Sequence, residues 1–199
     1  DFLLASPSAP LLEETKTALS QAFKMEAKGP IRSHLGLLYQ VDPTGDSLVI
    51  SCSAESYIDT MLNDFGMSSC SRARTPYNVG TYPSAHRDSP LLSEDGKKRY
   101  QGAVGRLMWL AVTYRLDLIT AVGFVPRSCS APTEAHWVEV KRILRYVAGT
   151  RNFKLSFKGG ARDFTLRCFS DSDYSGKTIG RKSTSGIYIS FNGFPVHWR

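Results

Sequence analysis

The sequence is poor in the residues that build metal or disulfide frameworks. Its four cysteines show no C-x-x-C spacing and its four histidines are equally scattered, so neither a zinc site nor a disulfide framework is indicated. No apolar run reaches the roughly eighteen residues that a membrane span requires, and no basic segment followed by an apolar one opens the chain. We therefore expect an intracellular chain, cytoplasmic or nuclear, with reduced thiols and no membrane contact.

Composition favours a folded protein with an anionic partner. Hydrophobic residues make up 42% of the 199 residues, which is enough for a packed core. Lys and Arg number 25 against 18 Asp and Glu, giving a net charge of +7 and a pI near 9.3. This excess favours nucleic acid as a partner, although many basic proteins bind none.

The first third of the chain predicts a helix, a hairpin and a second helix. Apolar residues recur at helical spacing over residues 11–25. Two apolar runs within residues 35–52 flank a turn at residues 42–45, which predicts a hairpin with a loop longer than two residues. Ser53 is then expected to cap a helix that stops at Gly66.

Residues 67–98 show neither helical nor strand periodicity and predict a linker or a long extended loop. A packed helix is expected from about residue 100, and a second one over 116–128 with Pro126 as a kink or early stop. A third helix is predicted from a cap at Thr133 to Gly149, with one apolar face and one basic face.

Beyond residue 150 the periodicity changes from helical to alternating. We expect strands over residues 153–157, 164–170, 184–191 and 194–198. The Asn192-Gly193 pair between the last two is a strong signal for a two-residue hairpin turn. The predicted fold class is therefore α/β in the α+β sense, with helices followed by a mainly antiparallel sheet.

Several segments, in order, carry a family resemblance: "LGLLYQVD", "YIDTMLNDFGM", "YQGAVGRLMWLAVTYRLDLITAV", "PTEAHWVEVKRILRYVAGT", "FSDSDYSG" and "GRKSTSGIYISFNGFPVHWR". Together they resemble the Ty1/copia-type retrotransposon polyprotein, at the end of its reverse transcriptase and the beginning of its ribonuclease H. The resemblance implies the end of a palm over residues 1–66, a linker or extended loop over 67–98, a helical thumb or connection region over 99–150, and the first strands of a truncated ribonuclease H-like domain over 151–199.

The resemblance also implies catalytic and metal-binding residues. Asp171 matches the first carboxylate of the nuclease, and Asp1 would be the second aspartate of the polymerase Tyr-x-Asp-Asp turn. Both would be Mg²⁺ ligands in the parent enzyme, while the other carboxylates of both sites would lie outside this segment. Two-metal phosphodiester chemistry needs several converging carboxylates. We therefore expect weak or absent Mg²⁺ binding and no catalysis by the fragment alone.

A simpler interpretation of the "FSDSD" stretch stays open. Asp171 and Asp173 are two residues apart and share one face if the strand persists that far. Both could instead end a strand and make turn hydrogen bonds. With the resemblance, Asp171 is favoured as a metal ligand and Asp173 as a supporting or turn residue.

Three basic residues on the predicted helix ending at Gly149, and two just beyond it, are candidates for contact with a phosphate backbone: Lys141, Arg142, Arg145, Arg151 and Lys154. An ordinary solvated helix face would look the same. The segment 176–186, with Lys177, Arg181 and Lys182, could extend the track or form a polar turn. The partners implied are an RNA–DNA hybrid or other nucleic acid and the remainder of the polyprotein.

Three functions are therefore compatible with the sequence. The first is a fragment of an RNA-directed DNA polymerase and ribonuclease H. The second is a non-catalytic nucleic-acid-binding remnant. The third is a relic without function, whose incomplete sheet leaves an edge prone to aggregation. Departures from the family pattern at Leu116, Pro126 and Lys177 leave the activity of the parent open.

Overall fold

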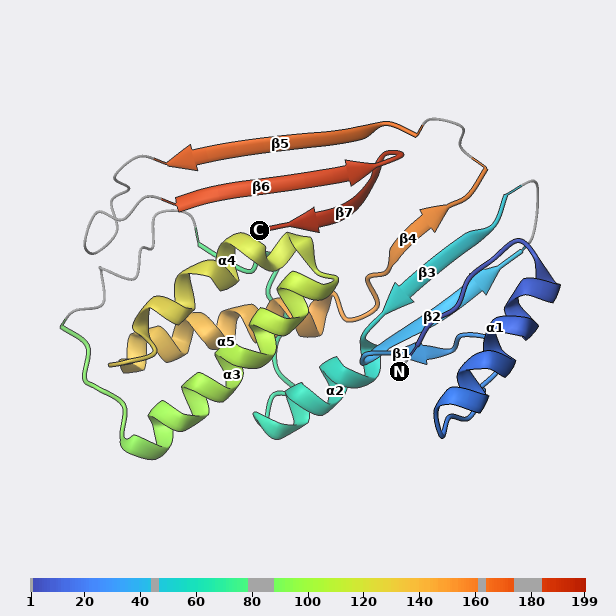
Figure 1. Cartoon of the computed structure of the whole chain (residues 1–199). Helices are drawn as coiled ribbons and strands as arrows, with labels where there is room; N and C mark the ends of the chain where they lie inside the picture. Colours follow the sequence, from blue (N-terminus) through green and yellow to red (C-terminus); the bar gives the residue numbers. More distant parts are fainter. Residues whose placement is uncertain (1, 44–46, 79–87, 161–163, 174–183) are drawn as a thin grey trace.

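The structure is a computed structural model that describes residues 2–43, 47–78, 88–160, 164–173 and 184–199 (Figure 1). Its helices are α1 (Ala9–Ala22), α2 (Glu55–Asp64), α3 (Glu94–Thr113), α4 (Ile119–Phe124) and α5 (Glu134–Gly149), with 3₁₀ turns at Leu116–Leu118 and Val125–Ser128. Its strands are β1 (Ser33–His34), β2 (Leu37–Asp42), β3 (Val49–Ser53), β4 (Leu155–Lys158), β5 (Leu166–Asp173), β6 (Thr184–Phe191) and β7 (Phe194–Trp198). The α+β class is confirmed.

The first sheet has the antiparallel order β1-β2-β3-β4. The predicted hairpin is confirmed, because β2 and β3 pair from Asp42 opposite Val49 to Leu38 opposite Ser53; part of its turn, residues 44–46, lies outside the described residues. Strand β4 pairs with β3 of the first sheet. The sequence had predicted that this strand belongs with the later strands of the second sheet. Leu155 and Phe157 of β4 pack against the core of the first part of the chain, and this burial explains the pairing.

The core lies between helices α2 to α5 and one face of the first sheet. Each helix buries an apolar stripe, as amphipathic helices in globular proteins do; the fully or nearly fully buried residues include Ile58, Met61, Leu107, Leu110, Leu118, Val122, Val140, Leu144 and Val147. Helix α1 buries none of its residues and lies beside the first sheet, toward the opposite end of the molecule from α5 (Figure 1).

The helix ends confirm some of the sequence predictions and correct others. Thr133 caps α5 in a reciprocal capping box with His136, and Gly149 is the last residue of α5, both as expected. Ser53 does not cap α2. It pairs with Leu38 in the ladder, so Ala54 occupies the cap position and supplies no side-chain hydrogen bond.

Helix α3 starts earlier than the periodicity suggested. Its cap is Ser93, whose hydroxyl accepts a hydrogen bond from the Gly96 amide at 3.2 Å, so the end of the predicted linker or loop at 67–98 is helical. Gly96 and two lysines near this end dilute the apolar period, which is why the pattern did not show it. The helix expected over 116–128 is divided into a 3₁₀ turn, α4 and a second 3₁₀ turn that carries Pro126 near its start.

The second sheet has the antiparallel order β5-β6-β7. Asn192 and Gly193 adopt φ of 54° and 80°, as the predicted two-residue hairpin turn requires. The indole Nε1 of Trp198 donates to the carbonyl oxygen of Ala111 on α3 at 2.7 Å, which ties this sheet to the helices below it in Figure 1. No helix in the described part of the chain is both long and apolar enough to cross a membrane.

Candidate functional site

Asp171 lies on β5, directly opposite Gly186 of β6, and its side chain is exposed. Its carboxylate oxygen Oδ1 accepts a hydrogen bond from the Ser172 amide at 2.9 Å. Gly186 has no side chain, and a Cβ built there would meet only backbone oxygens at 4.0 Å. The strand therefore persists through Asp171 and leaves one side of its carboxylate open.

Several other residues singled out from the sequence, for metal binding or for the phosphate track, are not placed. Asp1 lies outside the described residues, as do Lys177, Arg181 and Lys182, and the side chain of Asp173 is not described. Within the described ranges, no group of three or more His, Cys, Asp or Glu side chains could hold a metal ion. Because Mg²⁺ is held by carboxylates in octahedral geometry with several waters, the described residues do not by themselves fit a magnesium site built from three or more such side chains.

The basic side chains of α5 hold the chain segment of residues 67–78 against the helix. Arg145 donates from Nε to the Ser71 carbonyl oxygen at 2.6 Å, and a terminal nitrogen of Arg142 donates to Oγ1 of Thr75 at 2.8 Å. The Ala73 amide also donates to the carbonyl oxygen of Arg145 at 3.3 Å. The first part of the predicted linker is therefore an extended segment packed along α5.

The two basic residues beyond α5 contact other parts of the molecule. Arg151 forms ion pairs with Asp59 at 2.8 Å and with Glu55 at 3.9 Å, both on α2. Lys154 donates to the side-chain oxygen of Gln40 on β2 at 3.1 Å. The charge of Arg151 is thus largely balanced by α2, whereas Lys154 contacts the neutral Gln40 side chain.

A cavity of about 340 Å³ lies between the 67–78 segment and α5. We call it the α5 cavity. Residues from both sides line it: Met67, Ser71 and Asn78 from the segment, and Val138, Glu139, Lys141, Arg142 and Arg145 from the helix. Its lining includes three cationic side chains and one carboxylate, so the cavity carries a net positive charge.

Arg142 has an unusual environment within this cavity. Its Nε is buried and has no hydrogen-bond partner, alone among the buried side-chain nitrogen and oxygen atoms of the described residues. Leaving a buried donor unpaired costs about 1–3 kcal/mol, and more for a charged group. Lys141, the neighbouring cation, makes no ion pair with any residue that the structure describes. The Arg142 Nε is out of contact with solvent, so Lys141 supplies the donor at this site that a ligand can contact.

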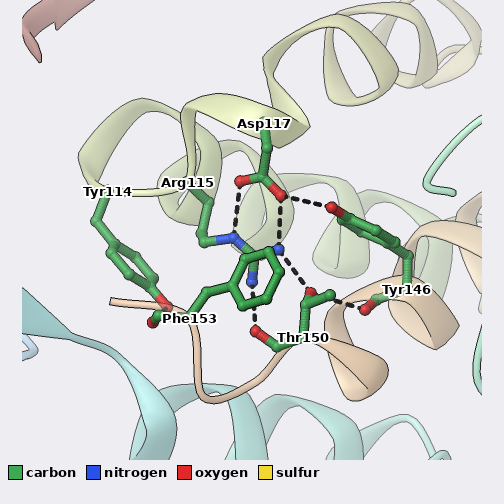
Figure 2. Close-up of polar contacts among 6 residues, drawn as sticks. All are labelled: Tyr114, Arg115, Asp117, Tyr146, Thr150 and Phe153. Carbon is green, nitrogen blue, oxygen red and sulfur yellow. Dashed lines mark hydrogen bonds and ion pairs between the residues drawn. The ribbon is translucent and has the colours of Figure 1, made fainter. Parts of the chain in front are cut away.

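A second polar cluster is internal and structural (Figure 2). The Arg115 side chain is only 2% exposed, and its Nε and one terminal nitrogen contact the two carboxylate oxygens of Asp117 at 2.8 and 2.7 Å. The guanidinium also donates to the carbonyl oxygen and Oγ1 of Thr150 and lies over the rings of Tyr146 and Phe153. This cluster fastens the end of α5 to the turn after α3.

The pKa shifts in this cluster follow from its charges. Burial alone would raise the pKa of Asp117, but hydrogen bonds from Arg115 and Tyr146 and the charge of Arg115 outweigh it, so the net shift is downward. Burial, together with the neighbouring carboxylate, raises the pKa of Tyr146. Asp117 therefore stays ionised beside the arginine.

Sequence reasoning did not find the Arg115 cluster or the α5 cavity. The first had a local signal in the Arg-x-Asp spacing of "YRLDL", since two residues at this distance can pair within one turn. The second had none, because its two walls are far apart in the chain and only folding brings them together.

Comparisons with known proteins support the resemblance. The chain is 33% identical along its whole length to a retrovirus-related Pol polyprotein from transposon TNT 1-94 of Nicotiana tabacum, and 30% identical to one from transposon RE2 of Arabidopsis thaliana. It is also 32% identical to an uncharacterized mitochondrial protein of Arabidopsis thaliana, of which it covers 78%. The chain belongs to the family of retrovirus-related Pol polyproteins of copia-type transposons.

The match covers only a small part of the longer relatives. The chain spans 15% of the Nicotiana polyprotein and 13% of the RE2 polyprotein. No protein-family model matches it, and no solved structure matches it.

Proposed function

We propose that this chain is the part of a retrotransposon polyprotein where the end of a reverse transcriptase meets the start of a ribonuclease H. Residues 2–66 with the first sheet would belong to the palm, helices α3 to α5 to the thumb or connection region, and β5 to β7 to the nuclease. The observation that carries this proposal is Asp171, an exposed carboxylate on β5 with Gly186 opposite it. Whole-chain similarity to Pol polyproteins supports it independently.

The parent activities would be RNA-directed DNA synthesis and cleavage of the RNA strand of a hybrid, both dependent on Mg²⁺. Asp171 would then be one of several carboxylates holding the metal at the nuclease site, which supplies the charge that stabilises the leaving oxygen. Since one carboxylate holds Mg²⁺ only weakly, we propose that the 199-residue chain catalyses neither reaction alone and needs the remainder of the polyprotein.

The decisive experiment compares Asp171→Asn with Asp88→Asn in a polyprotein that contains this segment. Asp88 is also exposed, so both variants lose one exposed carboxylate. Asp171→Asn should abolish Mg²⁺-dependent cleavage of the RNA strand, while Asp88→Asn should cleave at the parent rate. Equal cleavage by both variants would refute the nuclease assignment.

The 199-residue chain is tested alone in the same assay. We expect no metal-dependent cleavage and no DNA synthesis. Cleavage by the isolated chain that disappears in Asp171→Asn would contradict its proposed inactivity while supporting the role of Asp171.

A second candidate function is non-catalytic binding of nucleic acid along α5. The observation that favours it is the excess of cationic side chains in the α5 cavity. Binding of this kind contacts phosphates without selecting a sequence and weakens steeply with salt. We expect the chain to bind RNA–DNA hybrids of unrelated sequence with similar affinity, and a salt-independent affinity would exclude this interface.

A further inference from the structure

Strand β5 has one partner strand and exposes its side chains on both faces. The side chains from Leu166 to Ser172 are all exposed to solvent. In the described part of the chain only β6 pairs with β5, so the other edge of β5 presents backbone groups that no described strand takes up (Figure 1). A long exposed edge strand is a template for pairing with another chain.

The hydrogen-bond pattern shows which residues of β5 are free to pair. The Asn192 amide donates to the Thr165 carbonyl oxygen at 3.0 Å, so Thr165 directs this group toward β6. These directions alternate along an antiparallel strand, and the even-numbered residues from Leu166 to Ser172 therefore direct their backbone groups to the free edge. In agreement, the Ser172 amide donates to the Asp171 side chain at 2.9 Å.

The charges on β5 are arranged symmetrically about an aromatic residue. Arg167, Phe169 and Asp171 are two residues apart and share one face of the sheet; on that face the centroid of the Phe169 ring lies 6.1 Å from that of Tyr188 on β6. Arg167 and Asp171 form no ion pair with any residue that the structure describes. The strand is therefore positive on one side of Phe169 and negative at the same spacing on the other.

We propose that two copies of this chain pair antiparallel through β5, with Phe169 of both copies at the two-fold axis. A two-fold interface is self-complementary, so Arg167 of each copy lies opposite Asp171 of the other. Opposite charges directly across an antiparallel pair stabilise it, and a shift by two residues would separate Arg167 from Asp171. The inference goes beyond the proposed function and does not depend on it, because the pairing uses Asp171 only for its charge.

The free backbone groups fit this register. Even-numbered residues lie opposite one another, with Cys168 facing Ser170 of the second copy and Leu166 facing Ser172 of the second copy. Such pairs exchange backbone hydrogen bonds. The Ser172 amide then leaves the Asp171 carboxylate free for the arginine of the other copy, and the two sheets become one continuous sheet.

Charge exchange tests the register in the full chain by sedimentation velocity. Arg167→Glu and Asp171→Arg each place like charges opposite one another and should weaken dimerisation by about tenfold. The double variant restores opposite charges and should dimerise like the parent chain. Arg32→Glu reverses the same charge at an exposed position before β1 and should leave dimerisation unchanged. Because the exchanged side chains are exposed, these variants are expected to fold.

A disulfide tests the position of the two-fold axis. The two Phe169 residues form a non-hydrogen-bonded pair, in which the Cα atoms lie about 4.5 Å apart, within the reach of a disulfide. In a Cys168→Ser background, Phe169→Cys should therefore cross-link the dimer under mild oxidation. Ser172→Cys in the same background places its thiol far from its own copy across the axis and should not cross-link.

Three results would overturn the proposal. The first is a parent chain that stays monomeric, which would leave the edge of β5 to another occupant. The second is a double variant that dimerises as weakly as Arg167→Glu, and the third is equal cross-linking of Phe169→Cys and Ser172→Cys. A dimer that responds to charge exchange and cross-links through position 169 alone would establish the β5 interface.

Discussion

Arg115 and Asp117, two residues apart, form a two-point ion pair in which Nε and a terminal nitrogen of the arginine contact separate oxygens of the aspartate at 2.8 and 2.7 Å (Figure 2). The arginine is almost completely buried, whereas the aspartate side chain is 33% exposed. A buried charge is tolerated only when it is paired and hydrogen-bonded, so the fold around α3 and α5 depends on this pair.

Asp117→Ala should lower the free energy of unfolding by about 3–5 kcal/mol, because it leaves the Arg115 guanidinium buried without its counter-charge. Adding Arg115→Met removes that unpaired charge and should recover part of the loss. Urea denaturation of the single and double variants measures both quantities. A double variant less stable than Asp117→Ala would show that the arginine stabilises the fold mainly through Thr150 and the aromatic rings.

The stability of the chain should fall in acid partly through Asp117. Its pKa is lowered in the folded state, so the unfolded chain binds more protons and stability rises with pH through this range. The contribution is fully present above the unfolded value of about 4 and is lost as the pH falls through the lower folded value. Between pH 3 and 6, the free energy of unfolding should rise less steeply with pH in Asp117→Asn than in the parent chain. An equal dependence on pH in the two proteins would contradict the role of Asp117.

Trp198→Phe should loosen the second sheet without unfolding the helices. It removes the indole hydrogen bond to the Ala111 carbonyl oxygen, which is worth about 1 kcal/mol. Amide hydrogen exchange should become faster in β6 and β7 while the amides of α3 keep their protection. Uniform acceleration in the helices and the sheet would mean that the two unfold as one cooperative unit.

The second sheet also exposes apolar side chains. Phe164, two residues before β5, and Leu166, the first residue of β5, are 79% and 66% exposed, and the rings of Phe164 and Phe191 lie 6.2 Å apart. Clustered apolar surface of this kind promotes association. We expect the isolated chain to self-associate with rising concentration in sedimentation velocity experiments, and Leu166→Lys to reduce this association.

A matched change on another element provides the control for that experiment. Leu11 is 53% exposed on α1, so Leu11→Lys adds the same charge away from the second sheet. If the two lysine variants reduce association equally, the effect comes from net charge and not from the sheet. A chain that stays monomeric would exclude the sheet as an association surface.

The sequence by itself determined the local elements and the family. Hairpin turns, the Thr133 cap, the end of α5 at Gly149 and the change to strands after residue 150 were all predicted, because they follow from short-range chemistry such as turn residues, capping side chains and hydrophobic period. The membership in a retrotransposon polyprotein family was also readable, because it depends on the order of segments along the chain. The predicted strand ended at residue 170 and left the position of Asp171 open, and its pairing opposite Gly186 was not predicted.

Tertiary structure alone decided how these elements meet. The pairing of β4 with β3, the packing of residues 67–78 along α5 and the coupling of Arg115 to Thr150 join positions far apart in the chain, and no local period records them. The environment of Arg142 exists for the same reason: the helix supplies the arginine, but only folding brings Thr75 to its terminal nitrogen while its Nε stays buried. Local preference sets where a helix or strand forms, whereas burial of apolar surface and pairing of charges between distant segments set which surfaces and cavities result.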